Sequence, residues 1–565
     1  MVDVIDTTVL VVGAGPAGMT AALLLARLGI ACRIVERRAT PQTAPAAHVV
    51  NARTFEVLRA AGVDMERIAA ASQPPEDAGS VYWVTTLAGQ TLGRLPFERQ
   101  GDDLSDVTPT PLRNLSQHRL EPILADELRA AGVAVAYGRE WQHAEQDADG
   151  VTSQLRDAAT GAVVEVRSRW LLAADGAASP VRRMLGITPI GPDRLQSFVM
   201  IHLDADFRSL VGDRPGVLYW TTAPDATGTF VAHDVDRTWV FMHPFDPDTE
   251  SAAAYDEARC TAIVRRALGS DAHPFTVRTV RTWTMTAQVA ERYREGRIFL
   301  VGDAAHRFPP TGGLGLNTGV QDVQNLVWKI AAVEAGWAPA ALLDTYERER
   351  RPVAQRNADV SLQNAMRLME VYQALASIDP AARTAGTVPP STELATAIAN
   401  QAEHFDQLGL QLGFTYEGGA LVAGGASDGD ADEPSSVREY RPSARPGARL
   451  PHAWVTRDGR RVSSLDLVAL DRFTLIVGCD GAPWSDAAAT DAAPPLTTIR
   501  LGHDVLDPDG TWTTLLALAP DGAILVRPDQ HVAWRSARTD ANPGVALASV
   551  FAILLDRPAL APRAA

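Results

Sequence analysis

A glycine-rich turn near the amino terminus constrains the fold more than any other feature of the sequence. Residues 13–18 read Gly-Ala-Gly-Pro-Ala-Gly. The apolar run Thr8–Val12 precedes this turn, an Ala- and Leu-rich segment at Met19–Leu28 follows it, and the apolar run Ala31–Val35 ends at Glu36. The order of strand, turn, helix and strand is the βαβ unit of a parallel sheet.

Each glycine of the GxGxxG pattern has a physical role in such a unit. The first permits the tight turn, the second lets the backbone approach a pyrophosphate, and the third allows close packing of helix on strand. The helix N-terminus offers free N–H groups and a partial positive charge to the anion, and an acid at the end of the second strand can bond ribose hydroxyls. The predicted nucleotide contacts are Gly13, Gly15, Pro16, Ala17, Gly18, Glu36 and Arg37. This turn alone does not separate FAD from NAD(P).

A second nucleotide-binding element follows much later in the chain. The apolar run Arg297–Val301 ends at Gly302-Asp303, and a glycine-rich loop then leads into a long helix at Val320–Ala335. A carboxylate at a strand end can bond a polyol such as ribityl, and the loop presents N–H groups to an anion. The predicted contacts are Gly302, Asp303, Pro310, Gly313, Gly315, Leu316 and Asn317. Two such elements in one chain fit a single long cofactor held at both ends, which selects FAD.

Length and composition set broader limits. A single core stops growing at roughly 250–300 residues, so 565 residues predict two to four domains. The net charge of −16 disfavours a nucleic-acid partner. No stretch of about 18 charge-free apolar residues predicts a membrane span. Three scattered cysteines and no room for a signal peptide favour a reducing cytoplasm, and no Cys/His cluster predicts a metal site.

The fold class predicted from these patterns is mixed α/β. Between the two glycine elements the periodicity is near two, notably over Ser197–Pro244, as in antiparallel strands, whereas Gln73–Pro111 reads mainly as loop with short strands. The predicted units are a Rossmann-like FAD-binding domain at 1–185 plus 275–365, an inserted substrate-binding sheet at 186–274, a helical segment and linker at 366–436, and a strand-rich domain at 437–565. The acidic stretch at 424–434 is predicted to be a linker or surface loop.

A third motif completes a family pattern. Asp175-Gly176 follows the apolar run WLLAA and precedes Ser179 and Arg182. The GxGxxG, Asp-Gly and Gly-Asp motifs, in this order, resemble the 4-hydroxybenzoate hydroxylase class of flavoprotein monooxygenases. The resemblance implies cofactor roles for Asp175 and for Gln117, with Arg113 as a weaker candidate. It covers nearly the whole chain.

Within that class the chain is most similar to phenol and 2,4-dichlorophenol hydroxylases and to aromatic polyketide hydroxylases. The similarity lies in residues 47–56, in PPTGGLGLNTGVQDVQNLVWKI at 309–330, and in a C-terminal tail that resembles a thioredoxin-like domain. Cys479 has no second cysteine beside it, so a dithiol role is not expected. The resemblance implies bound FAD, NADPH or NADH as transient donor, O2, and hydroxylation of a phenolic ring through a flavin C4a-hydroperoxide. A homodimer is the default assembly.

Residues of the substrate site are harder to identify. His48 lies on a segment that approaches the substrate in the similar enzymes, and Tyr219 and His233 lie on the predicted sheet. These three are the candidate catalytic residues, with His202, Trp220 and His243 as further candidates for substrate contact; each also reads as an ordinary strand residue. Arg53 is a candidate for FAD contact or for a surface ion pair. No single residue stands out as the base.

Several other functions remain open at this stage. The same fold tailors polyketides and inserts oxygen beside ketones in Baeyer–Villiger fashion. An FAD-dependent dehydrogenase without oxygenation is a further alternative. A flavin halogenase would resemble this fold but would carry GxWxWxI, which the sequence lacks. A flavin-binding interaction module is the non-enzymatic alternative, and a substrate sheet argues against it.

Overall fold

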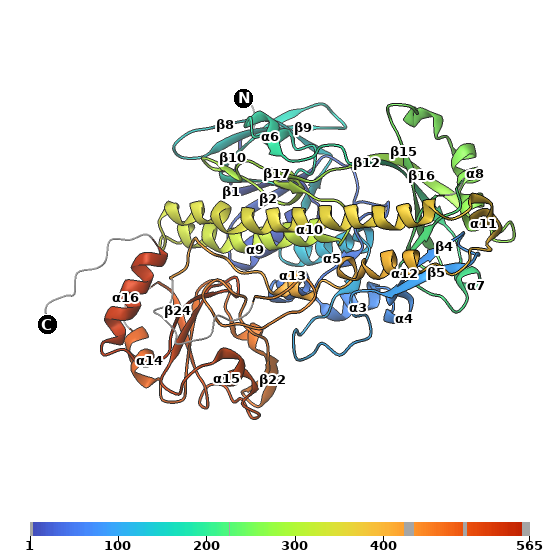
Figure 1. Ribbon diagram of the computed structural model, residues 1–565. Coiled ribbons are helices and arrows are strands. Elements are labelled where there is room, and N and C mark those ends of the chain that lie inside the picture. The colour runs from blue at the N-terminus through green and yellow to red at the C-terminus, as the bar shows by residue number, and fades with distance from the viewer. Residues whose placement is uncertain (1–3, 225–226, 423–433, 490–493, 556–565) are drawn as a thin grey trace.

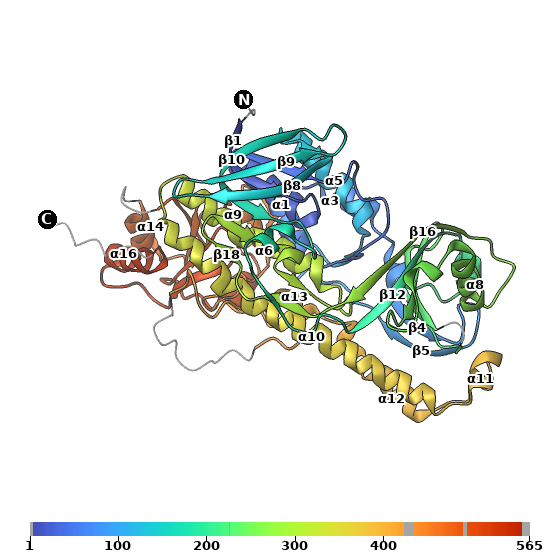
Figure 2. The ribbon, with the colours of Figure 1, turned by 90° about the horizontal axis from the view of Figure 1, so that it is seen from above.

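The computed structural model describes residues 4–224, 227–422, 434–489 and 494–555. Apart from Pro434, the acidic stretch expected as a linker lies outside these residues. Two large sheets occupy different parts of the molecule, and a long helix, α10 (Thr345–Ala376), runs along one side from the first sheet toward the second (Figure 2). The C-terminal strands and helices form a third unit, on the other side of α10 from the first sheet (Figure 1).

The first sheet brings the amino-terminal turn and the later Gly-Asp motif together. At its centre β1 (Val4–Val12) pairs in parallel with β2 (Cys32–Glu36) and with β10 (Val163–Ala173), and β10 pairs in parallel with β19 (Ile298–Leu300). The carboxyl ends of β1 and β19 therefore lie at one edge of the sheet, two strands apart. The carboxyl-terminal half of β1, Val9–Val12, is buried on both faces, which explains why these four residues are all apolar.

Small residues let two helices approach that edge. Helix α1 (Pro16–Arg27) packs against α9 (Leu314–Glu334), and both begin at the sheet edge. A Cβ added at Gly319 would lie 2.9 Å from the Cα of Gly302 and 3.3 Å from the Cβ of Ala17. Glycine at 302 and 319 thus permits α9 to start beside the turn after β19.

The second sheet has seven strands in the order β16-β12-β15-β14-β13-β4-β5, and all of its pairings are antiparallel except β13 with β4. Its strands are β4 (Ser80–Val84), β5 (Thr91–Pro96), β12 (Gln196–Asp204), β13 (Leu218–Thr221), β14 (Gly228–Asp234), β15 (Thr238–Phe245) and β16 (Thr276–Met285). The strands predicted within Ser197–Pro244 are confirmed. The sheet also recruits β4 and β5 from the segment expected to be mainly loop, because ladder bonds between distant strands leave no local sequence signal.

Alternation along these strands divides the side chains between two faces. On β12, Val199, Ile201 and Leu203 are buried in a core with helix α8 (Glu257–Leu268), whereas Phe198 and Met200 point the other way, toward the first sheet. The period of two that identified the strands thus also decides which side chains face the cofactor side.

The C-terminal unit is a four-stranded sheet between helices. The strand order is β24-β23-β25-β26, with β23 and β24 parallel and the remaining pairs antiparallel. Helices α14 and α16 pack with one face of this sheet and α15 with the other. The elements are β23 (Phe473–Val477), α14 (Ala482–Ala488), β24 (Leu496–Arg500), α15 (Thr511–Leu516), β25 (Ala523–Val526), β26 (Val532–Ser536) and α16 (Pro543–Leu554).

Buried ion pairs join this unit to α9 and α10. Glu349 at the start of α10 pairs with Arg527 at 2.7 Å and with Lys329, the only lysine of the chain, at 2.8 Å. Arg53 donates to Glu56 at 3.0 Å and to Gln530 at 2.7 Å. All of these side chains are buried. Arg53 was expected to contact FAD or to form a surface pair, and both expectations are wrong, because it is buried in this interface.

Candidate active site

The amino-terminal turn is held by backbone contacts that only glycine allows. Gly13 has φ +104°, and a Cβ there would lie 2.2 Å from the carbonyl oxygen of Ala174. A Cβ at Gly18 would lie 2.0 Å from the carbonyl oxygen of Gly13. A Cβ at Gly15 would meet nothing within 4 Å. The first and third glycines therefore serve packing, and the second faces open space.

That space is a cavity of about 680 Å³ between the two sheets. Both helix N-termini line it: Gly15 and Ala17 belong to the start of α1, and Gly313 and Gly315 to the start of α9. Neither helix has a side-chain cap. Their first N–H groups and positive dipole ends are thus available to an anionic ligand. Both glycine-rich elements line one cavity, as a single long cofactor requires.

Asp303 is a polar wall of the same cavity. Its side chain is exposed to the cavity and has no hydrogen-bond partner among the described residues. Burial by the surrounding protein raises the pKa of Asp303, although His306 and Arg307 oppose the shift. Below it, Asp322 accepts from the backbone N of Gly302 at 3.2 Å and fixes the turn. An unpaired carboxyl at this place suits the polyol chain of a flavin nucleotide.

Glu36 and the two arginines after it lie at the far end of β2. The Glu36 carboxylate accepts from the backbone N–H groups of Ala14 and Arg38, both at 2.9 Å. Burial favours the neutral acid, but these hydrogen bonds and the Arg38 guanidinium hold the pKa of Glu36 below its usual value. Glu36 therefore braces the turn as an anion. Arg37 is exposed. Contact of either residue with a ribose or phosphate stays a prediction.

The other predicted cofactor contacts separate into two groups. Gln117 and Pro310, together with Gly302 and Leu316, line the cavity. Arg113, Asp175 and Asn317 are not in the cavity wall. Arg113 belongs to the short strand β6 (Arg113–Asn114).

Asp175 and Asn317 support the cavity from behind. Asp175 is covered by protein, which raises its pKa, and it accepts from the backbone N of Val181 at 3.1 Å. The Asn317 side chain accepts from Asn51 N at 2.9 Å and donates to Val49 O at 2.9 Å. Asn317 thereby clamps the start of α9 to the segment that carries His48, so its side chain is occupied by protein partners.

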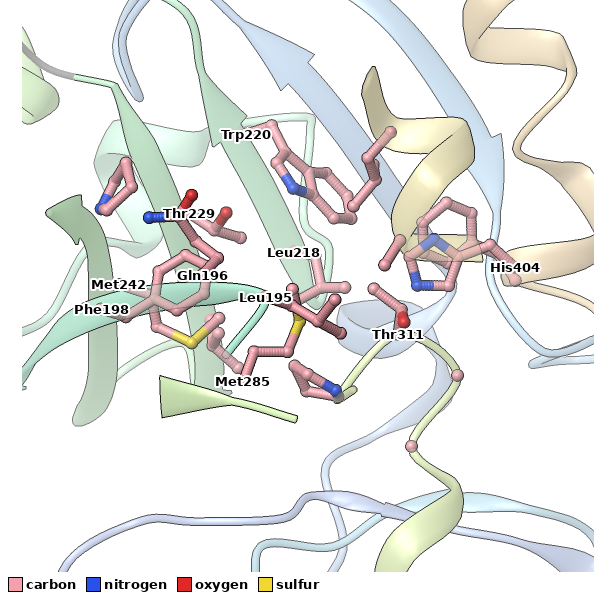
Figure 3. Close-up of a pocket in the computed structure, with 18 of the residues that line it drawn as sticks. Leu195, Gln196, Phe198, Leu218, Trp220, Thr229, Met242, Met285, Thr311 and His404 are labelled. Carbon is pink, nitrogen blue, oxygen red and sulfur yellow. The ribbon is translucent and has the colours of Figure 1, made fainter. Parts of the chain in front are cut away.

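A second cavity of about 400 Å³ adjoins the first (Figure 3). Both cavities are lined by His48, Val49, Val231, Met242, Pro310 and Gly313. The second is mostly apolar: Phe198, Leu218, Trp220 and Met242 come from the sheet, and Phe405 follows η4 (Ala402–His404) on the opposite side. Such a lining suits a flat apolar ligand.

Helix α10 forms a wall of the second cavity, and this wall was not predicted from the sequence. Its lining residues are Leu362, Ala365, Met366, Leu368, Met369 and Tyr372. They recur at the spacing of one helical face, which in sequence is indistinguishable from a core-facing stripe. The exposure of Met366 and Met369 on a folded helix, 61% and 49%, becomes apparent only in three dimensions.

The three candidate catalytic residues lie in different places. His48 is in the wall common to both cavities, and His233 lines the first cavity with its ring 5.2 Å from that of His48. Tyr219 lines neither cavity, because it is on the opposite face of β13, stacked on Tyr82, with its hydroxyl donating to Arg214 O at 2.7 Å. The structure therefore gives Tyr219 no route to a substrate, and its neighbour Trp220 takes the position facing the cavity.

Hydrogen bonds fix the tautomer of His48, and burial fixes its charge. The Asn114 amide nitrogen faces the acceptors Ala232 O and Gln73 Oε1, so the Asn114 Oδ1 faces His48 Nδ1, at 2.5 Å. His48 Nδ1 must then donate. Burial lowers the pKa of His48, so the ring is neutral and its Nε2 is a free acceptor among the described residues. Burial and the neighbouring His48 and His118 lower the pKa of His233 still further.

Two uncapped helix ends, an unpaired strand-end carboxyl and an adjoining apolar cavity are the features that an oxidoreductase with a bound flavin nucleotide requires. The FAD binding domain family matches residues 6–361, and the aromatic-ring hydroxylase C-terminal family matches residues 443–558. No group of three or more His, Cys, Asp or Glu in the described part of the chain is arranged to hold a metal ion, and no helix there is long and apolar enough to cross a membrane.

Individual relatives agree over nearly the whole chain. The tetracenomycin B2 monooxygenase-dioxygenase of Streptomyces olivaceus is 36% identical, with 98% of this chain and 100% of the relative covered. The 2,4-dichlorophenol 6-monooxygenase of Cupriavidus pinatubonensis is also 36% identical, with 98% and 97% covered. The flavin-dependent monooxygenase PieE, solved with FAD and substrate, superimposes with a TM-score of 0.88 at 34% identity, covering 98% of this chain and 100% of that one.

The chain belongs to the family of FAD-dependent aromatic-ring hydroxylases. It is a monooxygenase that uses FAD with NAD(P)H and O2, and the alternative of a dehydrogenase without oxygenation has no support among these relatives. The first cavity fits FAD by its two uncapped helix ends, the open face at Gly15 and the unpaired Asp303.

Proposed function

We propose that this enzyme hydroxylates a phenolic ring carried on a large, flat, multi-ring molecule. The relatives act, by their names, on substrates as different as a dichlorophenol and tetracenomycin B2. Pockets of roughly 300–1,000 Å³ hold ligands of drug size, and the second cavity of about 400 Å³ falls in that range. Its aromatic and methionine lining offers stacking and adaptable apolar contact rather than charge.

The position of His48 carries the proposal. FAD, when bound, would accept a hydride from NAD(P)H and activate O2, so that one oxygen atom can be transferred to the ring. His48 belongs to the wall between the cofactor cavity and the substrate cavity, and its neutral Nε2 can accept the proton of a phenol. A phenolate has higher electron density at the adjacent ring carbons, which favours electrophilic hydroxylation. Asn114 holds the imidazole in the required tautomer through Nδ1.

Other residues would position the two ligands. The proposed cofactor contacts are the N–H groups at Gly15, Ala17, Gly315 and Leu316, the carboxyl of Asp303, and Gln117. Phe198 and Trp220 would orient the substrate ring, and the apolar side chains of α10 would keep water from the reacting face. His233 lines only the cofactor cavity, and we propose for it a role next to the flavin rather than as substrate base.

A substrate panel tests the function. Phenols of one, two and three fused rings, including 2,4-dichlorophenol, are incubated with holoenzyme, NADPH or NADH, and labelled O2. We expect three-ring phenols to give the highest ratio of labelled product to donor consumed, because they fill the cavity. Labelled product from 2,4-dichlorophenol alone would contradict the multi-ring proposal, and label entering only from water would contradict oxygenation by activated O2.

Substitution of the proposed base tests the mechanism. Removal of a positioned general base typically lowers the rate about 10²- to 10⁴-fold, so His48→Gln should reduce kcat by at least about a hundredfold. FAD content should stay unchanged. His118→Gln is the matched control, because His118 is near His233 but lines neither cavity. A His48→Gln enzyme that keeps the wild-type kcat and pH profile would rule out His48 as the base.

The remaining proposals concern the whole chain. We propose that the C-terminal unit has a thioredoxin-like fold, supported by its strand order and by helices on both faces, and that it serves packing, since Cys479 stands alone. Three free cysteines support a cytoplasmic location. A homodimer is the commonest closed assembly and is our proposal for the oligomeric state.

A further inference from the structure

One carboxyl group lies in the otherwise apolar substrate cavity. Glu98 lines the second cavity and not the first. Its side chain is buried, and no other Asp or Glu lines this cavity within the described residues. Burying a carboxyl in an apolar pocket is unfavourable unless it has a partner, so its position needs an explanation.

The two oxygens of Glu98 are used differently. Oε2 accepts from the Gln411 side-chain amide at 2.9 Å and from the backbone N–H of Gln407 at 3.3 Å. Oε1 has no hydrogen-bond partner among the described residues. A protonated acid in this arrangement carries its hydrogen on Oε1, because Oε2 already faces two donors. The free oxygen is therefore an O–H donor.

The backbone is strained to place this side chain. Glu98 and Arg99 have φ of +46° and +52°, in the left-handed region that non-glycine residues rarely adopt. The strain is held by the backbone bond from Glu98 N to Phe405 O at 2.6 Å and by the pair of Arg99 with Asp406 at 2.8 Å. Strain of this kind collects at ligand-binding sites, where the surrounding structure over-determines it.

Burial favours the neutral form of Glu98. It raises the pKa of Glu98 to about 8 and the nearby Asp406 adds to the shift, although the hydrogen bonds from Gln407 and Gln411 and the charge of Arg99 oppose it. Asp406 also pairs with Arg438 at 3.1 Å. His404, in the same cavity, is buried beside Arg367 and has its pKa lowered to about 3, so it contributes no charge.

We infer that Glu98 is a specificity-determining residue that donates a hydrogen bond from Oε1 to a carbonyl oxygen on the substrate. The inference rests on the proposed assignment of this cavity to the substrate. It specifies the substrate class further: a fused-ring phenol that also carries a ketone or quinone oxygen. The apolar walls recognise the ring system, and Glu98 fixes its direction in the cavity.

Two inert probes isolate this contact. Anthraquinone and anthracene share a three-ring frame, differ in carbonyl oxygens, and do not titrate. Their binding to the FAD-containing enzyme is measured by equilibrium dialysis, and the quantity of interest is the ratio of the two dissociation constants. Loss of one hydrogen bond corresponds to about a tenfold change, so Glu98→Leu should lower the preference for anthraquinone about tenfold and leave anthracene binding unchanged.

The conservative variant and the pH profile distinguish loss of the hydrogen bond from misfolding of the variant. Between about pH 6 and about pH 10 the wild-type preference should fall as pH rises through the pKa of Glu98, because the carboxylate cannot donate. Glu98→Gln keeps an N–H donor and should hold the preference at every pH. Asp406→Asn removes a negative charge that raises the pKa of Glu98, so the fall of the preference should shift to lower pH.

Equal preference in Glu98→Leu and wild type, or a Glu98→Gln preference that still falls with pH, would overturn the inference. The ratio of dissociation constants is measured without catalytic turnover, so it tests the donor site separately from the proposed reaction. If the phenols of the substrate panel are not oxygenated while the anthraquinone preference follows Glu98, the donor site stands and the proposed reaction fails. If phenols are hydroxylated and the preference ignores Glu98, the reaction stands and the donor site fails.

Discussion

The cofactor cavity and the substrate cavity share a wall but are built from different parts of the chain. The first presents the backbone N–H groups at the N-termini of α1 and α9, with Asp303 as its unpaired carboxyl. The second presents side chains, such as Trp220, Met242 and Phe405. A site made of backbone demands glycine at fixed positions, whereas a site made of apolar side chains tolerates many residues of similar size.

Substitution of Glu349 should weaken ligand binding in both cavities, because Glu349 joins the elements that support them. Glu349 neutralises Lys329 of α9 and Arg527 of the C-terminal unit, and it belongs to α10. Breaking a buried pair by removing one partner typically destabilises by about 3–5 kcal/mol. Glu349→Gln should lower the free energy of urea unfolding by that amount and weaken the binding of FAD and of aromatic ligands together.

A partly exposed ion pair provides the control for Glu349. Arg59 and Asp466 also join the body to the C-terminal unit, at 2.8 Å, with each side chain about one-third exposed. Such pairs contribute about 0–1 kcal/mol, so Asp466→Asn should change unfolding little. A Glu349→Gln protein that loses only one of the two binding functions would show that the cavities are not coupled through this interface.

The glycine turn offers a sharper test on the cofactor side. Gly18→Ala places a Cβ 2.0 Å from Gly13 O, so α1 must move; overpacking of this kind destabilises by about 1–3 kcal/mol, and the protein should be purified without FAD. Gly15→Ala places its Cβ in open space within the cavity. It should leave urea unfolding of the FAD-free protein unchanged while lowering FAD affinity. Equal destabilisation of the two FAD-free variants would contradict the division of roles between these glycines.

The motifs explain why the cofactor site was largely predictable from sequence and the substrate site was not. The requirement for glycine at positions 13, 15 and 18 is local, so the pattern marked the turn, the strand before it and the helix after it. The wall formed by α10 could not be predicted, because its apolar stripe matches that of any core-facing helix. The pairing of β4 with β13 joins segments more than a hundred residues apart and has no local signal. His48 was identified by family resemblance, but its tautomer depends on Asn114, which only the fold brings to it.

Substitution of Asp303 tests whether a side chain of the cofactor cavity contributes to FAD affinity. It has no protein partner among the described residues, so its replacement breaks no contact of the FAD-free protein. A lost hydrogen bond to a charged group is worth about 1.5–3 kcal/mol, so Asp303→Ala should weaken FAD binding about tenfold to a hundredfold. Titration of FAD-free protein with FAD measures this. Wild-type affinity in Asp303→Ala would contradict the proposed contact between Asp303 and the cofactor.

A small effect on stability is expected for substitution of Tyr219, which tests which residues of β13 line the substrate cavity. Tyr219 and Trp220 are adjacent on β13 but face opposite sides of the sheet. Tyr219→Phe removes the hydrogen bond to Arg214 O, which should lower unfolding free energy by about 1 kcal/mol without changing the dissociation constant of a three-ring ligand. Trp220→Leu should do the reverse and weaken ligand binding while FAD content is kept. If Tyr219→Phe altered ligand binding as much as Trp220→Leu, the alternation of faces that assigns side chains to the cavity would be wrong for this strand.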